Sequence, residues 1–303
     1  MNKRMILYIQ GAILLIESAI MVLPIAAALI YRETSGVWFF YTALAAAICG
    51  FAAMKLSKPR TKTIYAKEGL ITVALGWIVL SLVGALPFTL SGEIPFYLDA
   101  VFEMISGFTT TGSSILPNVE ALSRCMLLWR SFSHWLGGMG ILVFMLAIVK
   151  MEGGQGIHLL RAESPGPTVG KMVPRMVDSS KILYTIYFAL TLVQVVFYLA
   201  GGMPLFDSLC NAFATAGTGG FSIKADSFAS YSMYAQTVTT VFMALFGVNF
   251  SIYFFLLQKK FDLAFKNTEL RWYVGIILFS IAMITANILP MYPDFHAAIH
   301  HAA

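Results

Sequence analysis

The chain has 303 residues, of which 58% are hydrophobic and 12% are charged, and its mean hydropathy is +0.78. Soluble domains carry about a quarter of their residues as charged side chains. This composition therefore excludes an ordinary soluble enzyme, a disordered chain and a disulfide-stapled secreted domain. The net charge of +5 needs no nucleic-acid ligand, because the basic residues gather in alternate connections between apolar stretches. The sequence predicts an integral membrane protein.

Membrane-spanning helices are the first predicted elements. A helix needs roughly 20 mostly apolar residues to cross a bilayer, and seven stretches qualify: 5–31, 34–54, 69–92, 131–149, 182–206, 227–258 and 272–293. The first stretch is too long for a signal peptide and has no small-residue cleavage pattern. We expect an all-α polytopic protein with about seven membrane helices in the lipid bilayer.

The basic residues predict the orientation of these helices. All but four of the 20 Lys and Arg residues precede the first helix or lie in the second, fourth and sixth connections. Positive charge favours the cytoplasmic side, so the N-terminus is expected there. The outer side instead carries Glu33, Glu93, Asp99, Glu103, Glu120, Asp207, Asp226 and Asp294. These acids either form a vestibule that concentrates cations or are ordinary loop residues, and charge alone leaves both open.

Two short apolar segments do not fit simple spans. Residues 95–108 and 204–216 are helix-compatible, and at about 20 Å each would cross roughly half a bilayer with its interfaces. Each is followed by a stretch rich in Gly and Thr or Ser, TTTGSS at 109–114 and GTGGFS at 217–222. A half-helix with an irregular return is typical of a re-entrant loop, so we expect two such pore loops.

The two loops also repeat each other. At a constant offset of 108 residues the identical pairs are Asp99/Asp207, Thr110/Thr218, Gly112/Gly220, Ser114/Ser222 and Ile115/Ile223. A unit of helix, pore loop and helix thus recurs over about 69–149 and 182–258. Both copies have the same orientation, which indicates parallel repeats.

Irregular backbone at membrane depth is tolerated where it lines a water-filled path. There, backbone carbonyls can replace the hydration shell of a potassium ion, and glycine permits the required backbone angles. A helix C-cap with Gly112 as its left-handed residue is the alternative explanation for the first loop. The equivalent second loop favours a selectivity filter in a potassium-channel-like arrangement.

Four segments carry a family resemblance. They are SGFTTTGSSIL at 106–116, LLWRSFSHWLGGMGI at 127–141, NAFATAGTGGFS at 211–222 and GVNFSIYF at 247–254. In these the chain resembles the Trk/Ktr/HKT superfamily of potassium transporters, most closely the TrkH/TrkG type, over essentially its whole length. His134 stands where glutamine is expected, and Ser113 and Ser114 where Ala-Thr is commoner.

The resemblance implies potassium uptake through one pore surrounded by four repeats, with potassium as substrate, no cofactor and no enzymatic activity. By position, the filter residues are Thr109, Thr110, Thr111, Gly112, Gly217, Thr218, Gly219 and Gly220. It also implies a homodimer in the bacterial inner membrane and a cytosolic nucleotide-binding regulatory subunit, which would dock on the cytoplasmic segment 150–179. Nucleic acid is not an expected partner, and proton or sodium symport remains open.

The expected organisation has five parts. Residues 1–68 hold two leading helices and a basic cytoplasmic loop, 69–150 the first repeat, 151–181 a cytoplasmic linker, 182–258 the second repeat, and 259–303 a cytoplasmic turn with the first helix of an incomplete third repeat. With four repeats implied, we expect this sequence to be a fragment or truncated product that does not transport potassium alone. A non-transporting partner subunit and an organic-solute carrier are the other hypotheses.

Several further residues carry expectations. Glu17, inside the first helix, is expected to make a helix–helix hydrogen bond rather than to transport ions. Arg130 either pairs with an outer acid such as Glu103 or extends to the membrane surface, and pairing is favoured. Close backbone packing is expected at Gly137, Gly138 and Gly140. An external loop, rather than a zinc site, is expected at His296, His300 and His301.

Overall fold

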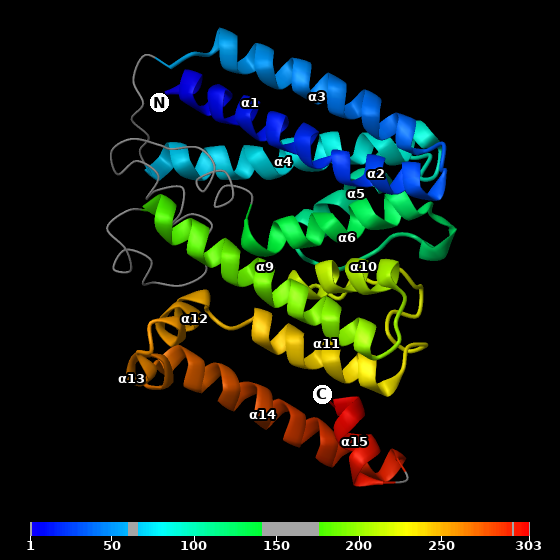
Figure 1. The fold of residues 1–303 in the computed structure, drawn as a ribbon, viewed down its shortest axis with the longest axis vertical. Helices are drawn as coiled ribbons and strands as arrows, with labels where there is room; N and C mark the ends of the chain where they lie inside the picture. Colours follow the sequence, from blue (N-terminus) through cyan, green and yellow to red (C-terminus); the bar gives the residue numbers. More distant parts are fainter. Residues whose placement is uncertain (1, 60–65, 141–175, 293, 303) are drawn as a thin grey trace.

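The computed structural model describes residues 2–59, 66–140, 176–292 and 294–302. Within these residues all regular structure is helical, as the sequence predicts. The long helices lie roughly side by side across the molecule, and their connections gather at its two ends (Figure 1).

Three helices precede the first repeat. Helices α1 (Lys3–Ile20) and α2 (Val22–Tyr31) follow each other almost directly, and α3 (Gly36–Leu56) returns beside α1. A β-carbon added to Gly11 would come within 2.7 Å of the Gly50 carbonyl oxygen, and the reverse distance is the same. The two glycines therefore allow α1 and α3 to touch backbone to backbone.

The first repeat consists of α4 (Ala66–Ser91), the half-helix α5 (Tyr97–Phe108), a 3₁₀ turn η1 (Val119–Ala121) and α6 (Arg124–Met139). The half-helix confirms the expected short element. Helix α6 begins seven residues before the predicted span 131–149, because the Trp- and Arg-containing segment ahead of it is helical too. Residues 141–149 of that predicted span lie outside the described residues.

The second repeat begins with α9 (Met176–Ala200), which starts before the predicted span and enters the predicted linker. The half-helix α10 (Leu205–Ala216) follows, as expected. Like α5, it starts at the end of the molecule opposite the N-terminus and points inward (Figure 1).

The predicted continuous span at 227–258 is wrong. The structure has α11 (Met233–Phe246) and α12 (Phe250–Leu257), which are bent by 86° relative to each other. The break has a local cause, since the Asn249 side chain accepts a hydrogen bond of 3.0 Å from the Ser251 amide and so starts a new helix.

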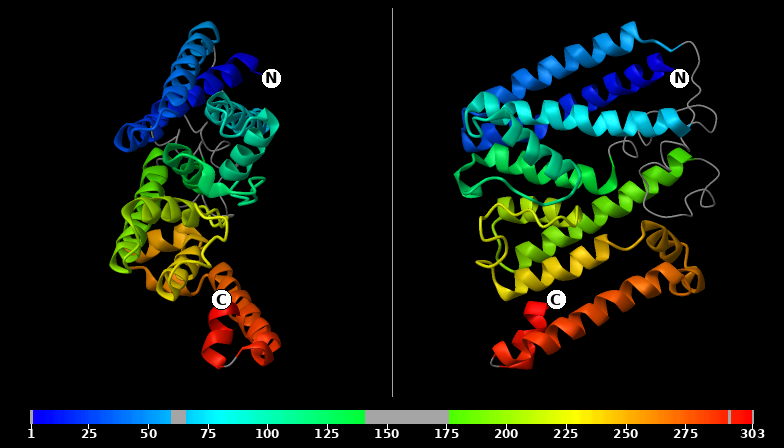
Figure 2. Two further views of the ribbon diagram at one scale, coloured as in Figure 1. Left: turned by 90° about the vertical axis from the view of Figure 1, so that its right-hand side faces the viewer. Right: turned by 180° about the vertical axis from the view of Figure 1, so that it is seen from behind.

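The C-terminal part contains α13 (Phe261–Phe265), α14 (Thr268–Ile288), the 3₁₀ turn η3 (Leu289–Met291) and α15 (Phe295–Ala302). The expectation of an external loop around the histidines is wrong, because α15 is a short helix. Helix α15 follows α14 as α5 follows α4. Figures 1 and 2 show α14 and α15 at the edge of the molecule.

Asp294 explains where α15 starts, since its carboxylate accepts a 2.7 Å hydrogen bond from the Ala297 amide. Asp99 and Asp207 lie in the first turns of the two other half-helices. The sequence signal for α15 was therefore present, as a third aspartate at the start of a short apolar segment. His300 contacts the second repeat, with its Nε2 atom 2.8 Å from Oε1 of Gln236.

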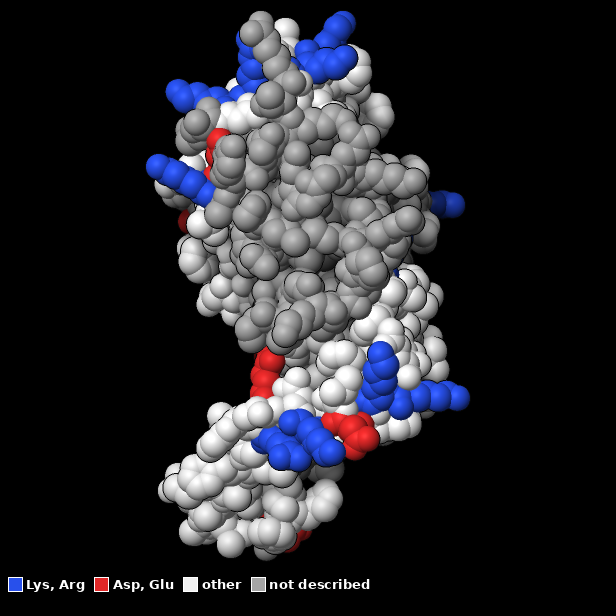
Figure 3. Space-filling view, turned by 90° about the vertical axis from the view of Figure 1, so that its left-hand side faces the viewer, with Lys and Arg blue, Asp and Glu red and all other residues white. Residues whose placement is uncertain are grey.

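Five helical stretches of the described residues are long and apolar enough to cross a membrane, or six if α11 and α12 form one span. They are Lys3–Tyr31, Gly36–Leu56, Lys67–Ser91, Lys181–Ala200 and Thr268–Met291. The protein is thus a multi-pass membrane protein. Its Lys and Arg side chains are spread over the end that holds the N-terminus (Figure 3).

An aromatic core fixes α6 between its neighbours. Trp129 lies edge-on to Phe39 of α3 and Phe108 of α5, with ring centroids 6.0 and 6.3 Å apart. Its indole donates a 3.0 Å hydrogen bond to the Gly84 carbonyl of α4. One residue of α6 therefore joins three other helices and holds the half-helix α5 in place.

Candidate functional site

The end of the half-helix α5 has an unusual backbone. The Thr110 amide donates to the Gly107 carbonyl at 3.0 Å and the Thr111 amide to the Ser106 carbonyl at 2.9 Å. These two bonds form a Schellman motif, in which the left-handed position usually holds glycine. Here Thr110 occupies it with φ +53°. The helix-cap alternative thus placed the left-handed residue wrongly, at Gly112 instead of Thr110.

The second loop repeats this geometry. Thr218 has φ +56°, and its amide donates to the Thr215 carbonyl at 2.8 Å. Two residues further on, Gly112 and Gly220 have φ +78° and +82°. Each loop therefore has a left-handed threonine followed by a positive-φ glycine at the same offset of 108 residues.

The two threonines are held in a costly conformation. A β-branched residue with positive φ is an outlier, and such a residue costs about 1–3 kcal/mol that the surroundings must offset. The Thr110 methyl carbon lies in the space beside two glycines, 2.9 Å from a β-carbon position on Gly137 and 3.2 Å from one on Gly217. Packing between α6 and the second loop therefore helps to hold Thr110 in place.

The two loops touch each other. A β-carbon on Gly112 would overlap the Gly219 carbonyl oxygen, and one on Gly219 would come within 2.5 Å of the Thr110 carbonyl oxygen. The structure thus brings the predicted segments 109–112 and 217–220 together from two separate repeats. Backbone carbonyls of both segments lie at this junction.

Two neighbouring glycines of α6, Gly137 and Gly138, pack against the two loops. Gly137 faces the Phe108 carbonyl at the end of α5, whereas Gly138 lies 3.0 Å from the Ala216 carbonyl oxygen, measured from an added β-carbon. Neighbouring glycines therefore contact different loops. The expectation of close backbone packing is confirmed for this pair, and the structure shows which partners it serves.

Two larger side chains of α6 enclose a residue of the second loop. The His134 ring stacks on Phe221 at a centroid distance of 4.0 Å and an interplanar angle of 19°. The Arg130 guanidinium carbon lies 3.6 Å from the centroid of the same ring. Arg130 also forms the expected pair with Glu103, at 2.9 Å. Helix α6 thus presents a continuous supporting face to both loops.

Acids at the end of the molecule opposite the N-terminus are used to build the site. The Glu33 carboxylate accepts hydrogen bonds from the Arg124 and Cys125 amides at 2.8 and 2.9 Å. The Glu93 carboxylate accepts from the Ser123 amide at 2.7 Å and from its hydroxyl at 2.8 Å. These two carboxylates cap the start of α6, where negative charge stabilises the helix. For both, structural use explains the acid better than a cation-collecting vestibule does.

Asp207, in the first turn of α10, makes a different structural contact. The Tyr231 hydroxyl donates to its carboxylate at 3.0 Å. Burial of Tyr231, in the connection before α11, raises its pKa above the ordinary tyrosine value. The phenol therefore stays protonated and remains a donor.

Glu17 does not make the expected helix–helix hydrogen bond. It is fully buried, and neither carboxyl oxygen has a hydrogen-bond partner among the described residues. Oε1 lies 3.3 Å from where Gly84 would carry a β-carbon. The Gly84 carbonyl already accepts from Trp129. Glu17 is therefore buried between α1, α4 and α5, where a β-carbon on Gly84 would also meet Met104 and Phe108.

Long apolar helices, with half-helices that bring two equivalent glycine-containing loops together, define a polytopic membrane protein with paired re-entrant loops. The model of the TrkH family, described as cation transport protein, matches residues 38–287. The chain belongs to this family.

Known relatives agree with this placement. The chain is 35% identical to the Trk system potassium uptake protein TrkH of Salmonella typhimurium, over 94% of this chain and 60% of that protein. It is 34% identical to TrkH of Halomonas elongata, over 100% of this chain and 64% of that one. The crystal structure of the potassium transporter TrkH from Vibrio parahaemolyticus matches with a TM-score of 0.85 and 29% identity, over 100% of this chain and 63% of that structure. The chain thus spans less than two thirds of the length of these relatives.

Proposed function

We propose that this chain contributes to potassium uptake by lining the ion path with backbone carbonyls of 109–112 and 217–220. The observation that carries the proposal is the repeated left-handed backbone at Thr110 and Thr218, in loops that touch each other. A carbonyl ligand set needs irregular backbone that the surrounding protein holds rigidly. The supporting face of α6 meets that requirement for both loops.

Potassium is the proposed ion because the relatives from Salmonella typhimurium and Halomonas elongata are potassium uptake proteins. The half-helices α5 and α10 add to this, since both end at the loops. The C-terminal end of a helix carries partial negative charge, which favours a cation there.

The experiment uses the protein expressed from its complete gene in a strain that lacks potassium uptake. Growth on limiting potassium and radioactive rubidium flux into vesicles measure transport, with sodium as competitor. Gly112→Ser is expected to reduce selectivity for potassium and rubidium over sodium, because a side chain there displaces the Gly219 carbonyl. Unchanged selectivity in a folded Gly112→Ser protein would reject the filter. Gly275→Ser is the matched control, since a β-carbon on Gly275 meets no atom within 4 Å in the part of the chain that the structure describes.

We also propose that the N-terminus is cytoplasmic and that the protein lies in the bacterial inner membrane. The support is that all but four of the 20 Lys and Arg residues precede the first helix or lie in the second, fourth and sixth connections. Figure 3 shows Lys and Arg side chains on the face that holds the N-terminus. A cysteine placed at Asn2 would then be protected from an impermeant thiol reagent in intact cells, whereas one at Asn118 would be labelled. The reverse labelling pattern would invert the topology.

A homodimer and a cytosolic nucleotide-binding subunit are proposed partners, on the basis of the family resemblance. Residues 150–175 of the proposed docking segment 150–179 lie outside the described residues, and 176–179 belong to the start of α9. Deletion of 153–166 is expected to abolish co-purification of that subunit and the response of transport to nucleotide. If both persisted, the docking proposal would be wrong, and light scattering of the detergent-solubilised protein tests the dimer separately.

A further inference from the structure

Each half-helix uses one polar side chain to hold the segment that follows its loop. Oε1 of Glu103 in α5 accepts a 2.6 Å hydrogen bond from the Ser114 hydroxyl and another of 2.6 Å from the Ile115 amide. In α10, Oδ1 of Asn211 accepts from the Ser222 hydroxyl at 3.4 Å. Glu103 and Asn211 are separated by the same offset of 108 residues as Ser114 and Ser222. The two repeats thus share this contact, although the acceptor residue differs.

Only the first of these equivalent positions carries a charge, and it faces Arg130. The Arg130 Nε atom donates to Oε2 of Glu103 at 2.9 Å, and the two side chains are 2% and 0% exposed. In the second repeat the position equivalent to Arg130 holds Val238. A neutral arrangement therefore suffices to hold one loop to its own half-helix, and the arginine must be explained by something else.

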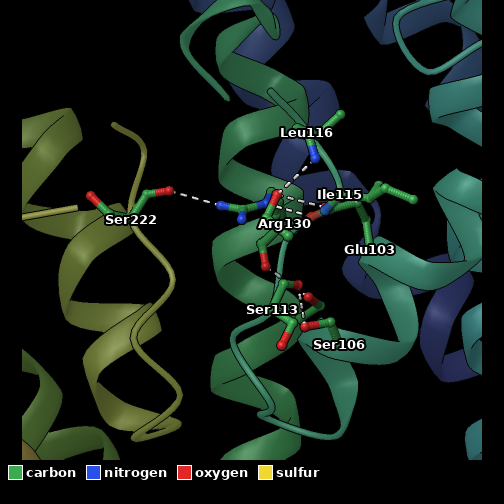
Figure 4. Close-up of polar contacts among 9 residues, drawn as sticks. Glu103, Ser106, Ser113, Ile115, Leu116, Arg130 and Ser222 are labelled. Atoms are coloured by element: carbon green, nitrogen blue, oxygen red, sulfur yellow. Dashed lines mark hydrogen bonds and ion pairs between the residues drawn. The ribbon is translucent and has the colours of Figure 1, made fainter. Parts of the chain in front are cut away.

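Arg130 also reaches the other loop. Its Nη1 atom donates a 2.7 Å hydrogen bond to the Ser222 carbonyl oxygen, and its guanidinium lies over the Phe221 ring. Figure 4 shows the guanidinium between Glu103 and Ile115 on one side and Ser222 on the other. One planar group, with donors in fixed directions, therefore connects the segment after the first loop with the segment after the second.

Stability alone does not account for this arrangement. A buried ion pair contributes little net stability, because the cost of removing both charges from water offsets their attraction. A rigid guanidinium bonded at both ends does, however, restrict the distance between the groups that it joins. Because Glu103 holds the segment after the first loop and Ser222 follows the second, restricting the distance between Glu103 and Ser222 also restricts the spacing of the two loops, which meet at Gly112 and Gly219.

We propose that Arg130 is a positioning residue that fixes the spacing of the two loops by joining Glu103 to the Ser222 carbonyl, and so sets their ion selectivity. The consequence for selectivity rests on the proposed function of the loops. The role of Arg130 in fixing the spacing of the loops does not rest on that function, so spacing and selectivity can be tested separately.

The test variant is Glu103→Gln/Arg130→Met. A glutamine amide oxygen still accepts from Ser114 and Ile115, and removal of both charges avoids leaving a lone buried ion. The link to Ser222 is lost. Arg124→Met is the control, because it removes a cation from the same helix, where Arg124 lies over Tyr31 instead of near the loops.

The first measurement is rubidium flux in competition with sodium, with thermal melting of each purified protein as the check of folding. The double variant is expected to melt close to the wild type and to lose selectivity by about tenfold, the effect of losing one charge-assisted hydrogen bond. The Arg124→Met control is expected to keep wild-type selectivity. A lower melting temperature with unchanged selectivity would overturn the proposal and leave Arg130 a purely structural residue.

The second measurement does not depend on transport. Spin labels at the exposed positions Pro117 and Ala225 report the distance between the segments that follow the two loops. The background variant is Cys49→Ser, because Cys49 is the exposed one of the free cysteines. The double variant is expected to broaden the distance distribution, and an unchanged distribution would overturn the proposal. If the wild type carries no ions but the distribution still broadens, the proposed function has failed while the positioning role of Arg130 stands.

Discussion

Gly112 of the first loop lies against the carbonyl oxygen of Gly219 in the second, so closely that a β-carbon on Gly112 would overlap that oxygen. Gly220 has nearly the same backbone angle, with φ +82° against +78°, but a β-carbon there meets no described residue within 4 Å. Two glycines at equivalent positions are therefore required for different reasons. Gly220 serves backbone conformation alone, whereas Gly112 serves both conformation and contact between the repeats.

Alanine at these two positions should have unequal effects. Gly220→Ala costs the left-handed conformation alone, about 1–2 kcal/mol, whereas Gly112→Ala adds displacement of the second loop. We expect a small loss of melting temperature for Gly220→Ala and a larger one, with reduced rubidium-over-sodium selectivity, for Gly112→Ala. Equal effects of the two variants would show that the loops do not touch as described.

The glycines of α6 give a second prediction. A β-carbon on Gly137 would press on the Phe108 carbonyl carbon at 2.9 Å and on the Thr110 methyl at the same distance. Gly137→Ala should therefore destabilise the folded protein by about 1–3 kcal/mol, as overpacking does elsewhere. Thermal melting in detergent measures this effect.

Gly275→Ala is the control for that experiment, because Gly275 is also helical but has open space around it. Alanine favours a helix interior over glycine by about 1 kcal/mol, so this variant should melt at the same temperature or slightly higher. If Gly137→Ala behaved like Gly275→Ala, α6 would not support the first loop.

Glu33 provides a third prediction, because its carboxylate accepts from the first two amides of α6. Glu33→Ala should lower stability by about 0.5–2 kcal/mol through loss of this cap. Ion selectivity should stay unchanged if the carboxylate acts in structure alone. Glu120→Ala is the control, since Glu120 is exposed and lies outside α6. If Glu33→Ala changed selectivity while keeping wild-type stability, the result would instead support the hypothesis that these acids form a vestibule that concentrates cations.

Glu17 gives the fourth prediction. A buried carboxyl group without hydrogen bonds is costly, and a methionine of similar size fits the space beside Gly84 without a polar group. Glu17→Met should melt at or above the wild-type temperature and should keep rubidium flux. A folded Glu17→Met protein that no longer carried rubidium would show that this carboxyl group takes part in transport.

Much of the local structure could be predicted because it depends on residues close together in the chain. The lengths of the apolar stretches gave the helices, and Pro95 and Pro204 preceded the two half-helices that the structure contains. Identical residues at a fixed offset identified the repeat, and the structure extends it to similar φ angles at Thr110 and Thr218, +53° and +56°. The bend at Asn249 was missed because hydropathy measures how apolar a segment is and carries no information about its direction.

Only the tertiary structure decided two kinds of contact. One kind involves backbone groups, which every residue has, and the other involves side chains that differ between the two repeats. The Ser222 carbonyl is a backbone group, so no residue type could have marked it as the partner of Arg130. Glu103 and Asn211 occupy equivalent positions but are different residues. A search for identical residues at a fixed offset therefore does not find this pair. The sequence by itself indicated five of the seven expected membrane spans that the described residues contain, or six if α11 and α12 form one span, and it indicated which loops repeat. The tertiary structure decided which atoms of those loops meet, because that depends on the packing of α6 between two repeats that lie far apart in the chain.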